Sequence, residues 1–112
     1  MGIEIELHRG RPAVPNRKAS RSTLLRGSYD HGEALARLLS ALPPDGGTTL
    51  PAVDPYGDTV LDQREADAAL RDEPALRRLC ATDRDTAAVD DLVAMLRTCA
   101  TTPDGHLWFM GD

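Results

Sequence analysis

The pattern of apolar and polar positions at the two ends of the chain predicts β-strands. Residues 3–8 alternate strictly between apolar and polar side chains, which is the period of a strand with one buried face. Residues 107–110 are four consecutive large apolar side chains, so a strand there is apolar on both faces and belongs at the centre of a sheet. The N-terminal strand is its natural partner. A short strand at residues 22–26 is predicted to return beside the first.

Two helices are predicted in the middle of the chain from capping boxes, in which an N-cap side chain and a residue three positions later bond each other's backbone. Asp30 and Glu33 have this spacing, and a stripe of leucines at positions 35, 38, 39 and 42 follows. Pro43 and Pro44 would end that helix. Asp62 and Glu65 form the second capping box, which opens another helix.

The second half of the chain predicts further helical structure. Pro74 fits the first turn of a short helix whose Leu76 and Leu79 face inward. Residues 86–100 carry the apolar stripe of a longer helix, formed by valines and leucines at positions 89, 92, 93 and 96. Residues 9–21 and 43–57, rich in Gly, Pro and polar side chains, are predicted as loops.

These elements predict one α+β domain that spans residues 1–112. Its small sheet has two to three strands, with the N-terminal and C-terminal strands paired, and three to four helices pack on it. The length suits a single domain with one core. No run approaches the ~18 apolar residues of a membrane span, and no secretory signal is visible, so we expect a cytoplasmic protein that does not enter a membrane.

Charge is distributed unevenly along the chain, whose formal net charge is −5. Residues 9–26 hold six basic and no acidic side chains, Arg17, Lys18 and Arg21 among them. Such a loop can bind phosphate through counterion release, but it has no aromatic residue to stack on bases, and the chain as a whole is acidic. We therefore expect the loop to lie against the acidic surface of its own domain, and nucleic acid is not the expected partner.

A possible ion site is the stretch from Asp54 to Glu65. Aligned with a twelve-residue EF-hand loop, Asp54, Asp58, Asp62 and Glu65 fall at positions 1, 5, 9 and 12. Two positions depart from the pattern, because Tyr56 replaces an acid or amide and the usual glycine is Thr59. The segment before the loop is too rich in Pro and Gly for the entering helix. A turn that leads into a capped helix is the favoured interpretation, and calcium binding is the alternative.

The same stretch carries a resemblance. Pro55-Tyr56-Gly57-Asp58-Thr59-Val60 resembles a turn in a set of small uncharacterised bacterial proteins, which also end in a hydrophobic-aromatic run followed by Gly-Asp, as residues 107–112 do. The resemblance implies no activity, because none is assigned to the set. It implies that the turn packs against the C-terminal strand. The set often has amides at the positions of Asp62 and Glu65, which argues against calcium.

Signatures of catalysis are absent from the sequence. There is no nucleophile elbow, no phosphate-binding glycine loop and no zinc spacing among the three histidines and two cysteines. His8 and His106 lie on strands that we expect to pair, but surface positions on those strands are the simpler interpretation. We expect neither cofactor nor metal, and a role as an enzyme is not favoured.

Three classes of function remain, and elimination favours the first. It is a small acidic protein-binding module of the immunity, inhibitor or regulatory type, in which complementary charge would speed association with a basic partner. Its candidate interaction residues are Tyr56, Asp58, Arg17, Lys18 and Arg21. The alternatives are a small enzyme with a site assembled from scattered residues, such as His8, His106, Tyr56 and Asp58, and a calcium or nucleic-acid binder through the 54–65 or 9–26 loops.

Overall fold

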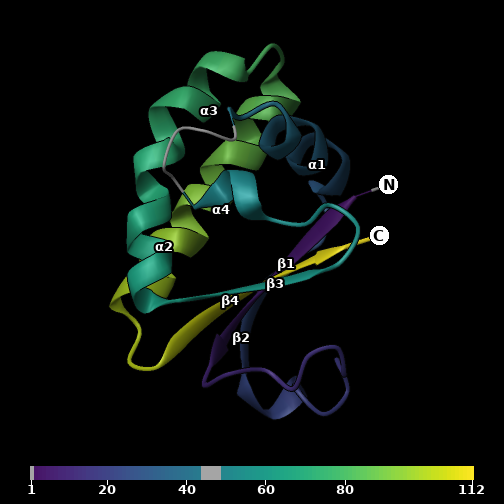
Figure 1. The fold of residues 1–112 in the computed structure, drawn as a ribbon, viewed down its shortest axis with the longest axis vertical. Coiled ribbons are helices and arrows are strands. Elements are labelled where there is room, and N and C mark those ends of the chain that lie inside the picture. The colour runs from purple at the N-terminus through teal and green to yellow at the C-terminus, as the bar shows by residue number, and fades with distance from the viewer. Residues whose placement is uncertain (1, 44–48) are drawn as a thin grey trace.

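The computed structural model describes residues 2–43 and 49–112 of the chain (Figure 1). In chain order its strands and α-helices are β1 (Ile3–Arg9), β2 (Leu24–Ser28), α1 (Gly32–Ser40), β3 (Asp58–Asp62), α2 (Gln63–Ala69), α3 (Glu73–Leu79), α4 (Asp83–Thr101) and β4 (Gly105–Gly111). Short 3₁₀ turns lie at Arg21–Thr23, Leu50–Ala52 and Leu70–Asp72. Within the described residues, no helix combines the length and the apolar character that a membrane crossing requires.

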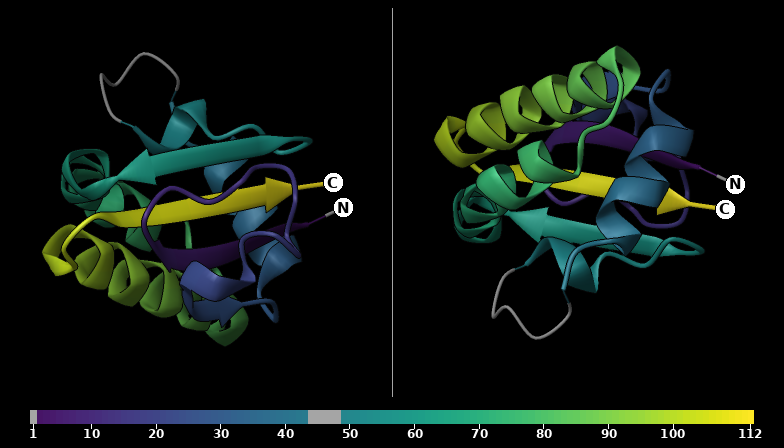
Figure 2. Two further views of the ribbon diagram at one scale, coloured as in Figure 1. Left: turned by 90° about the horizontal axis from the view of Figure 1, so that it is seen from below. Right: turned by 90° about the horizontal axis from the view of Figure 1, so that it is seen from above.

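The four described strands form one antiparallel sheet in the order β2-β1-β4-β3. The predicted pairing of the two chain ends is confirmed, because β1 pairs with β4 along its whole length at the centre of the sheet. Figure 2 shows both termini at the same end of these strands. The strand count is four, whereas the sequence predicted two to three. The additional strand, β3, is only five residues long, and α2 follows it directly.

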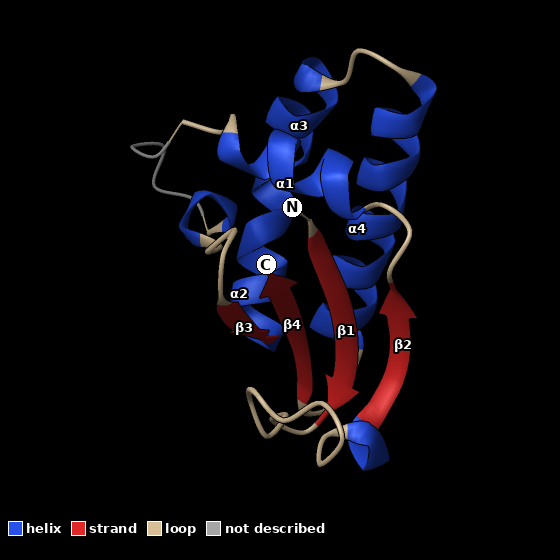
Figure 3. Cartoon of the chain, turned by 90° about the vertical axis from the view of Figure 1, so that its right-hand side faces the viewer, coloured by secondary structure: helices blue, strands red, loops and turns tan. Residues whose placement is uncertain are grey.

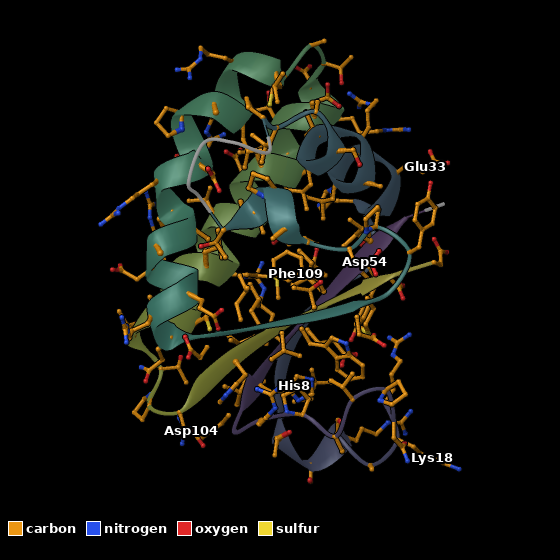
Figure 4. All side chains as sticks on the ribbon, viewed as in Figure 1. His8, Lys18, Glu33, Asp54, Asp104 and Phe109 are labelled. Atoms are coloured by element: carbon orange, nitrogen blue, oxygen red, sulfur yellow. The ribbon has the colours of Figure 1, made fainter. Side chains whose placement is uncertain are left out.

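The two faces of the sheet are covered by different parts of the chain. Ile5 and Leu7 of β1 and Phe109 of β4 are fully buried in the core against the helices. Residues 10–23, here called the covering loop, lie on the opposite face (Figures 1 and 2). Figure 4 shows Phe109 directed toward the helices and His8 toward the covering loop. Trp108 on that face is 1% exposed, so the loop encloses a second, smaller interior.

The helices follow the predicted apolar stripes, with corrections at two ends. All four leucines of the first stripe are buried, but the N-cap of α1 is His31 without a side-chain bond, so the capping box predicted at Asp30 is wrong. The second capping box is confirmed, since Asp62 accepts from Glu65 N at 2.9 Å and Glu65 Oε1 accepts from Asp62 N at 3.1 Å. Leu79 is 36% exposed instead of inward, because α3 ends there.

The predicted bounds of β2 need a correction, and the predicted loop at residues 43–57 is only partly described. The strand predicted at residues 22–26 begins two residues later, after a 3₁₀ turn. Of the predicted loop at residues 43–57, residues 44–48 lie outside the described part of the chain. Its end, Gly57, is bonded to β4 through the amide of Gly111 at 2.7 Å. The turn before β3 therefore packs against the last strand.

Candidate functional site

An acidic groove of about 770 Å³ lies at the end of the sheet where both termini are found. Its floor comes from Trp108 and Met110 of β4, and one wall comes from the first turn of α1. Two glycines make this arrangement close-packed, since the Cα of Gly2 and a Cβ built on Gly32 would lie 3.4 Å apart. A side chain at Gly32 would press on the start of β1 and push α1 away from the groove.

Negative charge dominates the groove. Its lining holds five carboxylates and two guanidinium groups: Glu4, Asp30, Glu33, Asp58 and Asp112, with Arg17 and Arg84. Arg17 is paired with Glu4 at 3.2 Å, and Asp58 accepts from Trp108 Nε1 at 2.9 Å. Within the described residues, no hydrogen bond or ion pair engages the carboxylates of Asp30 and Glu33. These two acids are available to a ligand that approaches from solvent.

One side of the groove is fixed by a buried polar cluster around Glu6. Its carboxylate is almost wholly buried and accepts from Tyr29 Oη at 2.7 Å and from Arg17 at 3.3 Å. His8 Nε2 lies 3.0 Å from the same carboxylate, so this nitrogen carries the proton, because a carboxylate only accepts. His8 Nδ1 contacts Thr23 Oγ1 at 2.9 Å. The cluster therefore joins β1 to the middle of the covering loop, at Arg17, and to its C-terminal end, at Thr23.

The contacts within this cluster lower the pKa of Glu6 and raise the pKa of Tyr29. Burial alone would raise the pKa of Glu6, but hydrogen bonds from Tyr29, His8 and Arg17 hold that pKa below its ordinary value. Burial and the neighbouring Glu6 carboxylate raise the pKa of the Tyr29 phenol. Glu6 is thus a fixed anion and Tyr29 a neutral donor near neutral pH.

Two of the five predicted interaction residues lie at the acidic groove, and three lie elsewhere. Asp58 and Arg17 line the acidic groove, whereas Tyr56, Lys18 and Arg21 do not. Tyr56 is 65% exposed in the turn before β3, and Lys18 lies at the outer end of the covering loop (Figure 4). The prediction that the basic loop lies against acids of its own domain holds for Arg17, which contacts Glu4 and Glu6.

The four residues of the calcium alternative do not converge. Asp58 and Asp62 stand at opposite ends of β3, four residues apart, which is ~13 Å along a strand. Each of the four carboxylates already accepts a bond in its own surroundings: Asp54 from Tyr56 N, Asp58 from Trp108, and Asp62 and Glu65 from each other's backbone. Six or more oxygens cannot meet around one ion in this arrangement.

The scattered residues of the enzyme alternative are not brought together either. His8 and His106 are directly opposite each other on β1 and β4, as the predicted pairing requires. His8 is fully buried, however, so its expected place on the surface is wrong, and both of its ring nitrogens have partners. Asp58 lies opposite Met110 and His106 opposite Asp62, which separates Asp58 from His106 by most of β3.

Several groove residues were not found by sequence reasoning. Asp30 was interpreted as a helix cap, and Glu33, His31, Arg84 and Asp112 carried no expectation of binding. They come from three separate parts of the chain, and no local spacing connects those parts. The apolar C-terminal run was the one signal in the sequence that bears on the position of the groove. It predicts a central strand, and residues at the end of a central strand lie beside both neighbouring strands.

The chain is thus an α+β protein with a four-stranded antiparallel sheet, helices on one face, a covering loop on the other, and an acidic groove at one end. Comparisons of the chain with protein-family models, with curated proteins and with solved structures found no significant match.

Proposed function

We propose that this protein is a small protein-binding module that holds a basic segment of a partner in its acidic groove. The observation that carries the proposal is the excess of carboxylates in a preformed hollow, where Asp30 and Glu33 have no described partner. A cationic side chain placed there gains attraction without first breaking an internal ion pair. Clefts lined by charge of one sign also concentrate ligands of the opposite sign and speed encounter.

The lining also offers apolar surface beside its charge. Among its lining residues, Pro15 and Tyr29 are exposed and provide apolar surface along which the stem of a lysine or arginine can lie. The groove therefore offers both apolar contact and charge. Whether the module acts as an immunity, inhibitor or regulatory protein depends on the partner that it binds.

The experiment compares two baits that carry the same change of charge. Asp30→Asn/Glu33→Gln removes two of the five negative charges of the groove, whereas Asp67→Asn/Asp104→Asn removes two exposed acids that do not line it. Partners are isolated from the native cell with the wild-type chain, and their affinity for each variant is measured by calorimetry at two salt concentrations. We expect the groove variant to weaken binding at least tenfold and to reduce its salt dependence, and the control variant to bind as the wild type does.

Equal binding by all three proteins would refute the groove as the interface. Binding to nucleic acid alone, lost when arginines of the covering loop are removed, would refute the protein-binding proposal itself.

A further inference from the structure

The outer edge of β3 is free of any described strand. β3 pairs with β4 on one side, and the sheet ends there (Figure 3). The bond from Gly111 N to Gly57 O makes that opposing pair a hydrogen-bonded one, and such pairs alternate along an antiparallel ladder. Thr59 and Leu61 therefore direct their backbone groups to β4. The N–H and C=O groups of Asp58 and Val60 are directed outward.

Position 62 agrees with this alternation. The outward N–H of Asp62 is taken by Glu65 Oε1 at 3.1 Å, within the capping box of α2. The free edge is consequently short: Asp58 and Val60 offer both backbone groups, whereas the carbonyl of Asp62, the N-cap of α2, accepts the first bond of that helix. Short extended peptides add to free sheet edges through such backbone groups.

The outward-bonding residues of this edge place their side chains on one face of the sheet. Asp58, Val60 and Asp62 lie opposite Met110, Trp108 and His106, so all three project from the sheet face that is turned away from the helices. Asp58 and Asp62 are exposed, and Asp58 also lines the acidic groove. A strand laid beside β3 would meet the order acid, apolar, acid at alternate positions. Its complement is basic, apolar, basic, and this pattern is the same read in either direction.

The opposite edge of the sheet does not offer such a site. Leu7 pairs with Arg26 and His8 with Leu24, which leaves Leu25 as the extra residue of a β-bulge. A bulge twists an edge strand and hinders pairing. Arg26 and Ser28 of β2 are also bonded to Asp91 of α4. Of the two edge strands in the described part of the chain, β3 is the one that joins a regular free edge to acidic side chains without a cationic partner.

We propose that β3 receives an extended basic segment of a protein partner as a fifth strand, with basic side chains opposite Asp58 and Asp62 and an apolar one opposite Val60. The inference rests on the proposed function, because it identifies the partner segment as basic. It adds how the segment binds, which is by backbone pairing along β3. Asp58 belongs both to this edge and to the groove, so one segment reaches both.

The probe is a blocked peptide, Thr-Lys-Thr-Val-Thr-Lys-Thr, added to the full ¹⁵N-labelled chain. We expect its binding to shift the amide resonances of Asp58 and Val60 and to slow their hydrogen exchange, because these N–H groups gain partners. A second peptide of the same sequence and charge is methylated on the backbone nitrogens of its lysines and valine. It should bind about tenfold more weakly, since it cannot complete the ladder.

Two variants separate this proposal from the groove. Asp62→Asn keeps the helix cap, because asparagine caps as well as aspartate, and it should weaken the peptide several-fold by removing one charge. Asp30→Asn/Glu33→Gln should leave peptide binding at β3 within about twofold, since neither acid lies on β3. If the groove variant no longer binds the native partner and the peptide does not protect Asp58 and Val60 from exchange, the groove is sustained and strand addition is overturned.

Three other outcomes also overturn strand addition: equal binding of the methylated peptide, shifts confined to groove residues, and no shift at β3. Peptide protection at β3, together with native-partner binding that Asp30→Asn/Glu33→Gln leaves unchanged, would sustain the edge and refute the groove.

Discussion

Substitution of Glu6 by glutamine tests the buried cluster that holds the covering loop. The change preserves size and removes one charge from a side chain that is almost wholly buried. Tyr29, Arg17 and His8 each direct a donor at this carboxylate, at 2.7, 3.3 and 3.0 Å. Bonds to a charged group contribute about 1 kcal/mol more than neutral ones, and the new amide also turns a donor toward these donors. We therefore expect a loss of roughly 3 kcal/mol.

That loss is large for a chain of this size. The total free energy of unfolding is on the order of 6–15 kcal/mol for about a hundred residues, and a change of this size lowers Tm by roughly 12 °C or more. Urea unfolding at neutral pH, followed by the fluorescence of Trp108 and by circular dichroism, measures it. Glu4→Gln is the matched control, because Glu4 is on the same strand and face but half-buried, with a single contact to Arg17. It should cost less than about 1 kcal/mol.

The pH dependence provides a second readout. Hydrogen bonds depress the folded-state pKa of Glu6 below its ordinary value of 4.5. The carboxylate therefore stabilises the folded protein above that value, and this contribution is lost as the pH falls through the folded pKa. The stability difference between wild type and Glu6→Gln should shrink correspondingly in acid. A variant within 0.5 kcal/mol of the wild type at neutral pH, or a difference that does not change in acid, would refute the reasoning.

Three further predictions concern helix capping, thiol reactivity and the buried indole. Asp62→Ala should lower the free energy of unfolding by about 1 kcal/mol while Asp62→Asn stays near the wild type, as urea titration of both would show. Burial raises the pKa of the Cys99 thiol to about 11, so a disulfide reagent at pH 8 should label Cys80 in the folded chain and Cys99 only after unfolding. Rapid labelling of folded Cys80→Ser would contradict this. Trp108→Phe removes the bond to Asp58 and should cost about 1–2 kcal/mol in thermal unfolding, whereas no loss would show that the bond is unimportant.

Much of the architecture followed from local pattern in the sequence. Strict alternation at residues 3–8 and the apolar run at 107–110 were sufficient to predict that β1 and β4 pair at the centre, because a segment apolar on both faces cannot lie at an edge. The stripes of α1 and α4 and the capping box at Asp62 are likewise short-range signals, since helical neighbours are three or four residues apart.

Other features depended on contacts between distant parts of the chain. Nothing local makes His8 a buried residue. It is buried because the covering loop folds back over the sheet and brings Thr23 to its ring. The strand β3 was missed because its five residues show alternation too briefly, and it forms by pairing with β4.

The acidic groove shows most clearly the difference between what local sequence pattern determines and what contacts between distant segments decide. The composition determined that the chain is acidic. Asp30, Asp58 and Asp112 line one groove only after the four strands have paired and α1 has packed at the end of β1. Sequence alone therefore determined the elements and the central strand pair, because these depend on periodicity. Tertiary structure decided where charge gathers, since that depends on which distant segments become neighbours.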